Sequence, residues 1–210
     1  AITERLYEGF VAKFNAHLTE YPYLLGGKPC IGDFGLMCPL YGHLGRDPVP
    51  HRLLQMRGPW IHRWVERMNR PEPDTGEYIN LPHSFLQDDE VPETIIELLT
   101  HFALDFVPET IASHSGINQW LEENKPATGA QCERYSGEAE FDVEGTSIHV
   151  WTQPFRFYLL ERVQSAVQAL KGSDQADALA LLDTCNMTAV LDLKLDRKIG
   201  RANNLEVWLD

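Results

Sequence analysis

Hydrophobic positions recur with the period of an α-helix in separate segments of residues 1–68. Residues 2–18 carry large apolar side chains on one side of the predicted helix and charged side chains on the other. Segments 52–56 and 60–68 have the same pattern, and each follows a break made by proline and glycine. The pattern therefore predicts that the chain begins as a bundle of amphipathic helices.

One further segment of this region, residues 31–43, is apolar on almost every side. A helix with no polar face belongs in the interior of a fold, because it has no side suited to water. Pro39 lies inside this segment, where it removes one amide donor and presses on the carbonyl four residues back. We expect a central helix that is kinked at Pro39.

The residues at the start of this segment are suited to capping a helix. A carboxylate three residues after the N-cap can accept a hydrogen bond from the amide of the N-cap residue, as Asp33 would from Cys30. An apolar residue before the cap packs on one in the first turn, as Pro29 would on Phe34. The sequence predicts a capping box closed by a hydrophobic staple.

The second half of the chain is predicted to be helical, with one β-hairpin. Residues 69–77 have the composition of a linker, and a broad apolar face from Pro92 to about Lys125 predicts two helices or one bent helix. Alternating positions around the turn Glu144-Gly145-Thr146 predict a hairpin near 138–152.

Two helices and a possible pair of strands complete the predicted elements. A helix opens at Pro154 and ends at Gly172, and Ser173 is suited to cap the next one. In the tail, residues 190–195 alternate like a strand and could pair with residues 205–209.

The segment from Leu24 to Phe34 resembles the capping box and hydrophobic staple of the C-terminal helical domain of the glutathione S-transferase family. Residues 21–29 resemble the family's connection into its capped helix, and residues 59–68 resemble the helix that packs beside it. The expected fold is mainly α: a glutathione S-transferase C-terminal-like helical core over residues 1–75, followed by a helical extension with the hairpin over residues 76–210.

The resemblance also implies a function. The chain would be the C-terminal portion of a glutathione S-transferase-like protein and would supply the hydrophobic-substrate side of a glutathione conjugation site. Glutathione, the co-substrate, would bind a thioredoxin-like N-terminal domain that this chain does not include, so the chain alone would be inactive and hold no catalytic residue. The implied partners are a small hydrophobic electrophile and a second copy in a homodimer. The aromatic residues expected in the substrate site are Tyr41, Trp64, Phe102 and Trp120.

Two functions of other classes compete with this one. The same helical fold serves in non-catalytic protein-interaction modules, and fold alone does not separate the two. Glu97, His101 and Asp105 lie four apart on one predicted helix and could hold a metal, although ion pairing on a solvated face explains the spacing better. His43, His51 and His62 form no known ligand motif, so we expect no metal cofactor.

The net charge limits the kinds of binding partner, and the cysteine content indicates the cellular compartment. Eighteen basic against 31 acidic residues give a net charge of −13, which disfavours nucleic acid and anionic membranes. The four cysteines lack metal or disulfide spacing, which predicts reduced thiols in the cytoplasm. Cys30 at a helix N-terminus could instead be a reactive thiolate, but a capping role is the favoured interpretation. Ala1 in place of methionine suggests a processed or cut N-terminus.

Overall fold

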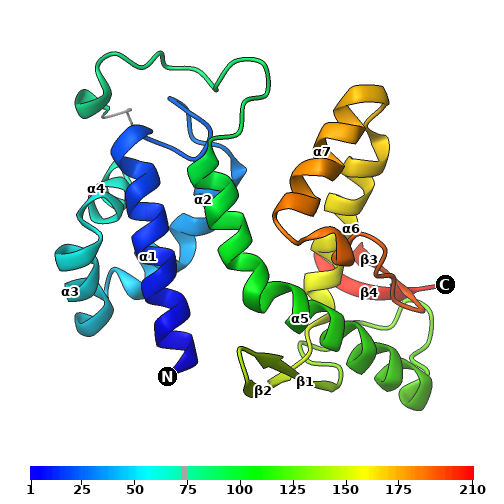
Figure 1. Cartoon of the computed structure of the whole chain (residues 1–210). Helices are drawn as coiled ribbons and strands as arrows, with labels where there is room; N and C mark the ends of the chain where they lie inside the picture. Colours follow the sequence, from blue (N-terminus) through cyan, green and yellow to red (C-terminus); the bar gives the residue numbers. More distant parts are fainter. Residues whose placement is uncertain (72–74) are drawn as a thin grey trace. The chain divides into compact units, whose positions relative to one another are not determined.

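Helices account for 58% of the structure, which confirms the mainly helical class (Figure 1). The computed structural model describes residues 1–71 and 75–210. Within these ranges the strands form two antiparallel sheets of two strands each. None of the described helices combines the length and apolar character that a membrane span needs.

Two compact units divide the chain: unit 1 covers residues 1–101 and unit 2 covers residues 102–210. The sequence predicts a boundary at residue 75, and this division stays a prediction. Part of the predicted linker, residues 72–74, lies outside the described residues. Directly after them, residues Gly76–Tyr78 form a short 3-10 helix, η2.

Unit 1 is a small helical bundle whose four predicted helices are all present. Helix α1 packs on α3 and α4, and α2 packs on α4. The rings of Phe14 in α1 and Trp64 in α4 form a T-shaped pair with 5.1 Å between centroids, and both side chains are fully buried. The helices are α1 (Ile2–Glu20), α2 (Ile31–Pro39), α3 (Pro48–Arg57) and α4 (Pro59–Met68).

The helix that contains Pro39 changes type at that residue. Helix α2 ends at Pro39, and the chain continues as the π-helix η1 (Leu40–Leu44). A π-turn has wider hydrogen-bond spacing and often accompanies a local irregularity in a helix. The helical hydrogen bonding therefore changes directly after Pro39, and the kink itself stays a prediction.

The predicted interior position of α2 is wrong. Ile31 is 90% exposed and Phe34 is 59% exposed, and Asp33 is the buried residue of the helix. Apolar residues on every side of a helix do not determine how many of those sides are covered. In unit 1, α2 packs on α4 through one side, which leaves the opposite side facing solvent.

His17, near the end of α1, is a fully buried titratable group of unit 1. Its Nε2 donates a hydrogen bond to the carbonyl of Tyr23 at 3.1 Å, and its Nδ1 lies 2.8 Å from the hydroxyl of Thr94. Burial lowers the pKa of His17 and outweighs the opposite effects of the Tyr23 carbonyl and of Asp33. The neutral ring, which accepts the Thr94 hydroxyl at Nδ1, is the form that the fold favours.

Acid is therefore expected to destabilise unit 1 through His17. The pKa of His17 is lower in the folded protein than in the unfolded chain, whose histidine titrates at about pH 6.5. Below that pH the unfolded chain binds more protons than the folded protein, so the free energy of unfolding falls. Above that pH the stability is retained. Urea unfolding followed by circular dichroism at pH 7.5 and 5.5 measures this loss. His17→Gln keeps a donor for Tyr23 without titrating and should show a smaller loss; equal losses would contradict the prediction.

The helix α5 (Glu93–Asn124) begins in unit 1 and continues into unit 2 as one element. Pro108 lies inside it and does not split it into two helices. The predicted hairpin follows as β1 (Glu138–Val143) and β2 (Thr146–Trp151). Glu144 and Gly145 have positive φ values of 51° and 80°, as a tight hairpin turn requires.

The helices α6 (Pro154–Ala169) and α7 (Gly172–Thr184) lie side by side in unit 2 (Figure 1). Both were predicted, but the N-cap of α7 is Lys171, and Ser173 lies inside the helix. The predicted strand over residues 190–195 is absent: the short 3-10 helix η3 (Thr188–Val190) and a turn lie there instead.

The partner of the last strand is β3 (Lys198–Ala202), which pairs antiparallel with β4 (Leu205–Leu209). Only Asn203 and Asn204 join the two strands, with φ values of 52° and 63°. Asparagine tolerates positive φ, and a two-residue turn of this kind matches the twist of paired strands. This local turn accounts for a pairing that the alternation of residues 190–195 did not predict.

The core of unit 2 forms around Trp208, which is fully buried and stacks on Trp120 with 6.0 Å between ring centroids. Burial raises the pKa of the Cys132 thiol to about 12, so this thiol is protonated at neutral pH. The core residues come from α5, the loop that follows it, α6, η3 and both strands of the second sheet: Ile117, Leu121, Cys132, Phe157, Leu160, Val190, Ile199 and Trp208.

Candidate functional site

Asp33 is the centre of a buried hydrogen-bond cluster at the start of α2. One carboxylate oxygen accepts the amide of Cys30 at 2.9 Å, which is the predicted capping contact. The other accepts the amide of Leu24 and the indole N–H of Trp64, each at 3.2 Å. Because Asp33 is fully buried, this cluster ties the turn before α2, the first turn of α2 and helix α4 together.

The rest of the predicted cap differs from expectation. Phe34 points to solvent, so it is not buried as the predicted staple with Pro29 required. Burial raises the pKa of the Cys30 thiol, despite the opposing effect of backbone hydrogen bonds, which favours the neutral thiol over a reactive thiolate. Cys30 is therefore the N-cap residue of α2, and its backbone amide makes the capping contact by donating to Asp33.

The four aromatic residues expected in a substrate site divide between the two units. Trp64 is fully buried in unit 1, and its indole is engaged by Asp33. In unit 2, Phe102 is half-buried on α5, and Trp120 stacks on Trp208 in the core. Trp64 and Trp120 thus have packing roles, and Tyr41 lines a pocket.

Tyr41 lies at a pocket of about 370 Å³ in unit 1, together with residues of α3 and α4. Arg46 lies over the Tyr41 ring, 4.5 Å from its centroid, in a cation–π contact. The Nε2 atoms of His51 and His62 are 3.3 Å apart on another side of this pocket. In this contact one ring donates its N–H to the unprotonated Nε2 of the other.

The candidate metal set on α5 has other partners. His101 donates from Nε2 to the carbonyl of Leu6 at 2.7 Å, and Glu97 pairs with Lys13 at 3.6 Å. Across the described ranges, no group of three or more His, Cys, Asp or Glu side chains is placed to hold a metal ion. Glu97 is thus engaged in an ion pair and His101 in a hydrogen bond to the backbone.

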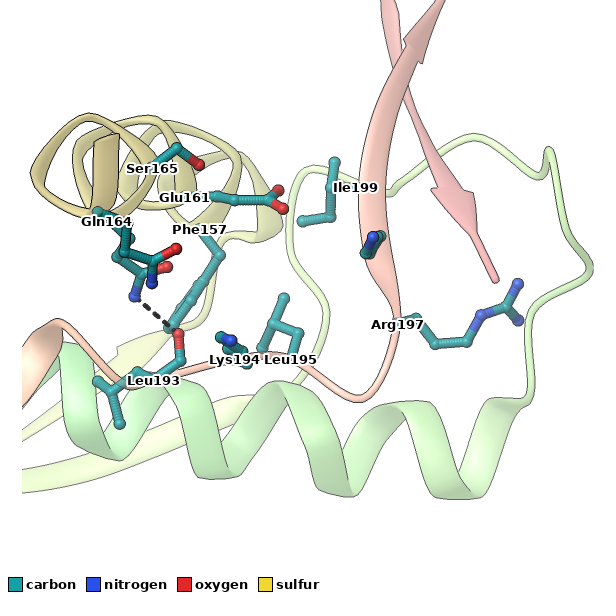
Figure 2. Close-up of a pocket in the computed structure, with 11 residues that line it drawn as sticks. Phe157, Glu161, Gln164, Ser165, Leu193, Lys194, Leu195, Arg197 and Ile199 are labelled. Carbon is teal, nitrogen blue, oxygen red and sulfur yellow. Dashed lines mark hydrogen bonds between the residues drawn. The ribbon is translucent and has the colours of Figure 1, made fainter. Parts of the chain in front are cut away.

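A second pocket, here called the α6 pocket, lies within unit 2 between α6 and the chain that leads into β3 (Figure 2). Its volume is about 240 Å³. It has an apolar floor made by Phe157, Leu193, Leu195 and Ile199. Its polar lining consists of Glu161, Gln164, Ser165, Gln168, Lys194, Arg197 and Lys198.

Sequence reasoning missed the α6 pocket because it treated residues 190–195 as a strand. The run from Lys194 to Lys198 carries a basic residue at three of its five positions, which is unusual in so acidic a chain. This basic run was the feature of the sequence that could have indicated the α6 pocket.

Comparison with known proteins gives no relative: no protein-family model, curated protein or solved structure matches this chain. The function is therefore argued from the residues and their geometry.

Proposed function

We propose that this chain is the helical C-terminal part of a glutathione S-transferase-like protein. In this proposal it supplies the hydrophobic-substrate side of a conjugation site, and glutathione binds a thioredoxin-like domain that precedes it. The observation that carries the proposal is the Asp33 cluster, in which a carboxylate three residues into the helix accepts the amide of Cys30. This is the local geometry expected from the resemblance of residues 24–34 to the family's capped helix.

The exposed side of α2 supports the presence of a further covering segment. Ile31, Phe34 and Cys38 are spaced three and four residues apart, so they share one face of the helix, and all three are exposed. A continuous apolar face of this kind commonly marks an interaction surface. In the proposed protein, this α2 face packs on another domain.

Retention on immobilised glutathione tests the proposal. We expect no retention of this chain by itself, and retention together with conjugating activity when the protein includes the upstream thioredoxin-like domain. If the longer protein neither binds glutathione nor conjugates an electrophile such as 1-chloro-2,4-dinitrobenzene, the proposal is wrong.

The α2 face can be tested in the same longer protein. Phe34→Asp should weaken domain packing and lower conjugating activity, because it places a charge in the proposed contact. Met56→Asp is the matched control, since Met56 is also exposed, at 70%, but lies on α3. Equal activities of the two variants would remove the α2 face from the proposed domain contact.

A non-catalytic interaction module is the second candidate, and the same α2 face favours it. In that case Phe34→Asp would abolish a stable complex with a partner protein, while glutathione binding would be absent from every form of the protein. Light scattering of the complex, with Met56→Asp as the control, distinguishes this candidate from a transferase.

A further inference from the structure

The walls of the α6 pocket are fixed by buried and backbone hydrogen bonds. The amide of Gln164, which is 5% exposed, donates to the carbonyls of Val190 and Leu193 at 2.8 and 2.9 Å. These bonds join α6 to the opposite wall, and Figure 2 draws one of them beside Leu193. A pocket whose walls are already held in place loses little conformational entropy when a ligand binds.

The segment that forms the opposite wall is fixed at three more points. His114 donates to the carbonyl of Lys194 at 2.7 Å, and the amide of Asp196 donates to the side chain of Asn118 at 3.0 Å. The Arg197 guanidinium donates to the carbonyls of Leu209 and Pro126, which turns it away from the pocket (Figure 2).

Two lysines that line this pocket have ammonium groups without an ion-pair partner among the described residues. Neither Lys194 nor Lys198 forms an ion pair with any residue that the structure describes. The acidic residue of the lining is Glu161, which likewise has no ion pair there. With Arg197 engaged elsewhere, the lining has two ammonium groups and one carboxylate that form no ion pair, so its local charge is positive.

This local charge is opposite to that of its surroundings. Unit 2 has nine lysines and arginines against 17 acidic residues. A large polyanion would be repelled by the acidic residues of the whole unit. A single anionic group beside the lysines interacts mainly with charges nearer than the screening distance, which is about 8 Å at physiological salt. The field therefore selects a small anion over nucleic acid or an anionic membrane.

We propose that the α6 pocket binds a small amphipathic carboxylate, with its carboxylate at Lys194 and Lys198 and its hydrocarbon part on the apolar floor. The volume of about 240 Å³ sets the scale of that ligand. It corresponds to about eight non-hydrogen atoms when each takes about 30 Å³, the share of a water molecule in the liquid. Octanoate, a medium-chain monocarboxylate with ten non-hydrogen atoms, is close to this size, and its carboxylate and hydrocarbon tail match the polarity of the lining.

Binding is tested with the full chain and three probes of equal chain length: octanoate, octanol and octylammonium. Methyl resonances of Leu195 and Ile199 report occupancy of the pocket in NMR titrations. We expect saturable binding of octanoate that is about tenfold tighter than that of octanol, because two exposed ion pairs contribute modestly, and no detectable binding of octylammonium. Salt at 1 M should remove the preference for octanoate over octanol.

Charge variants assign the anion contact to particular residues. The double variant Lys194→Gln, Lys198→Gln should weaken octanoate binding about tenfold and leave octanol unchanged. Glu161→Gln should strengthen octanoate binding, because it removes the repelling carboxylate. The matched control is Lys125→Gln, Lys171→Gln, which changes the net charge equally but lies outside the pocket lining.

Several results would overturn the proposal: octanoate producing no saturable shifts, octanol binding as tightly as octanoate, or both double variants behaving alike. Since all these substitutions are at exposed positions, a retained circular dichroism spectrum verifies the fold of each variant. The pocket lies within unit 2 and the titration requires no second domain. Its failure is thus independent of the failure of the transferase proposal.

Discussion

Replacing Asp33 by alanine is expected to lower the free energy of unfolding by about 3 kcal/mol or more. The substitution leaves the amides of Cys30 and Leu24 and the indole N–H of Trp64 without their acceptor. Each buried donor that loses its partner costs about 1–3 kcal/mol. Urea unfolding monitored by circular dichroism measures the loss.

The asparagine variant distinguishes the contributions of the two oxygens of the Asp33 carboxylate. Asp33→Asn keeps one oxygen, which can still accept the Trp64 indole, but puts an amide N–H₂ group in place of the oxygen that faces Cys30. We expect a loss between those of wild type and Asp33→Ala. A cost below about 0.5 kcal/mol for Asp33→Ala would mean that water or another group satisfies these donors, which contradicts the role given to the cluster.

Replacing Trp208 by alanine is expected to cost about 3–5 kcal/mol, as is typical of large aromatic residues removed from a core. Trp208 is fully buried and stacks on Trp120, so its removal leaves a cavity and one unpaired aromatic face. The same urea experiment measures this effect.

The phenylalanine variant is the control for cavity size at this position. Trp208→Phe keeps an aromatic ring of smaller volume and should lose less stability than Trp208→Ala. If the two substitutions cost the same, the stability lost would not depend on the volume removed. The central packing role assigned to Trp208 would then be wrong.

Local signals in the sequence located most of the helices and the first hairpin. The helix over residues 2–18, the one that opens at Pro154 and the turn at Gly145 depend on spacing and on residues near in the chain. The contact of Asp33 with Cys30 was predictable for the same reason, because it spans three residues.

Features that depend on distant packing were not predictable in this way. Periodicity identifies an apolar side of a helix but not whether anything covers it, so α2 was wrongly placed in the interior. The contact between His51 and His62 joins two helices, and the sequence positions of the two residues do not predict that they meet.

The candidate substrate residues show the same limit. Large aromatic side chains at helical spacing suit a pocket and a core equally well, and their sequence positions do not distinguish the two. Only the three-dimensional packing separates Trp64, which is fully buried, from Tyr41, which lines a pocket. The α6 pocket, in turn, depends on the course of residues 193–199 after a 3-10 helix that no periodicity indicated.

The unequal burial of the four thiols gives the chain an intrinsic probe of its own unfolding. Cys38 is exposed on α2, whereas Cys132 and Cys185 are buried in unit 2. An alkylating reagent such as iodoacetamide should modify Cys38 in the native protein and reach Cys132 only after unit 2 opens. Mass spectrometry of the labelled peptides would then follow the opening of unit 2 at natural cysteines, without an introduced dye or a substitution.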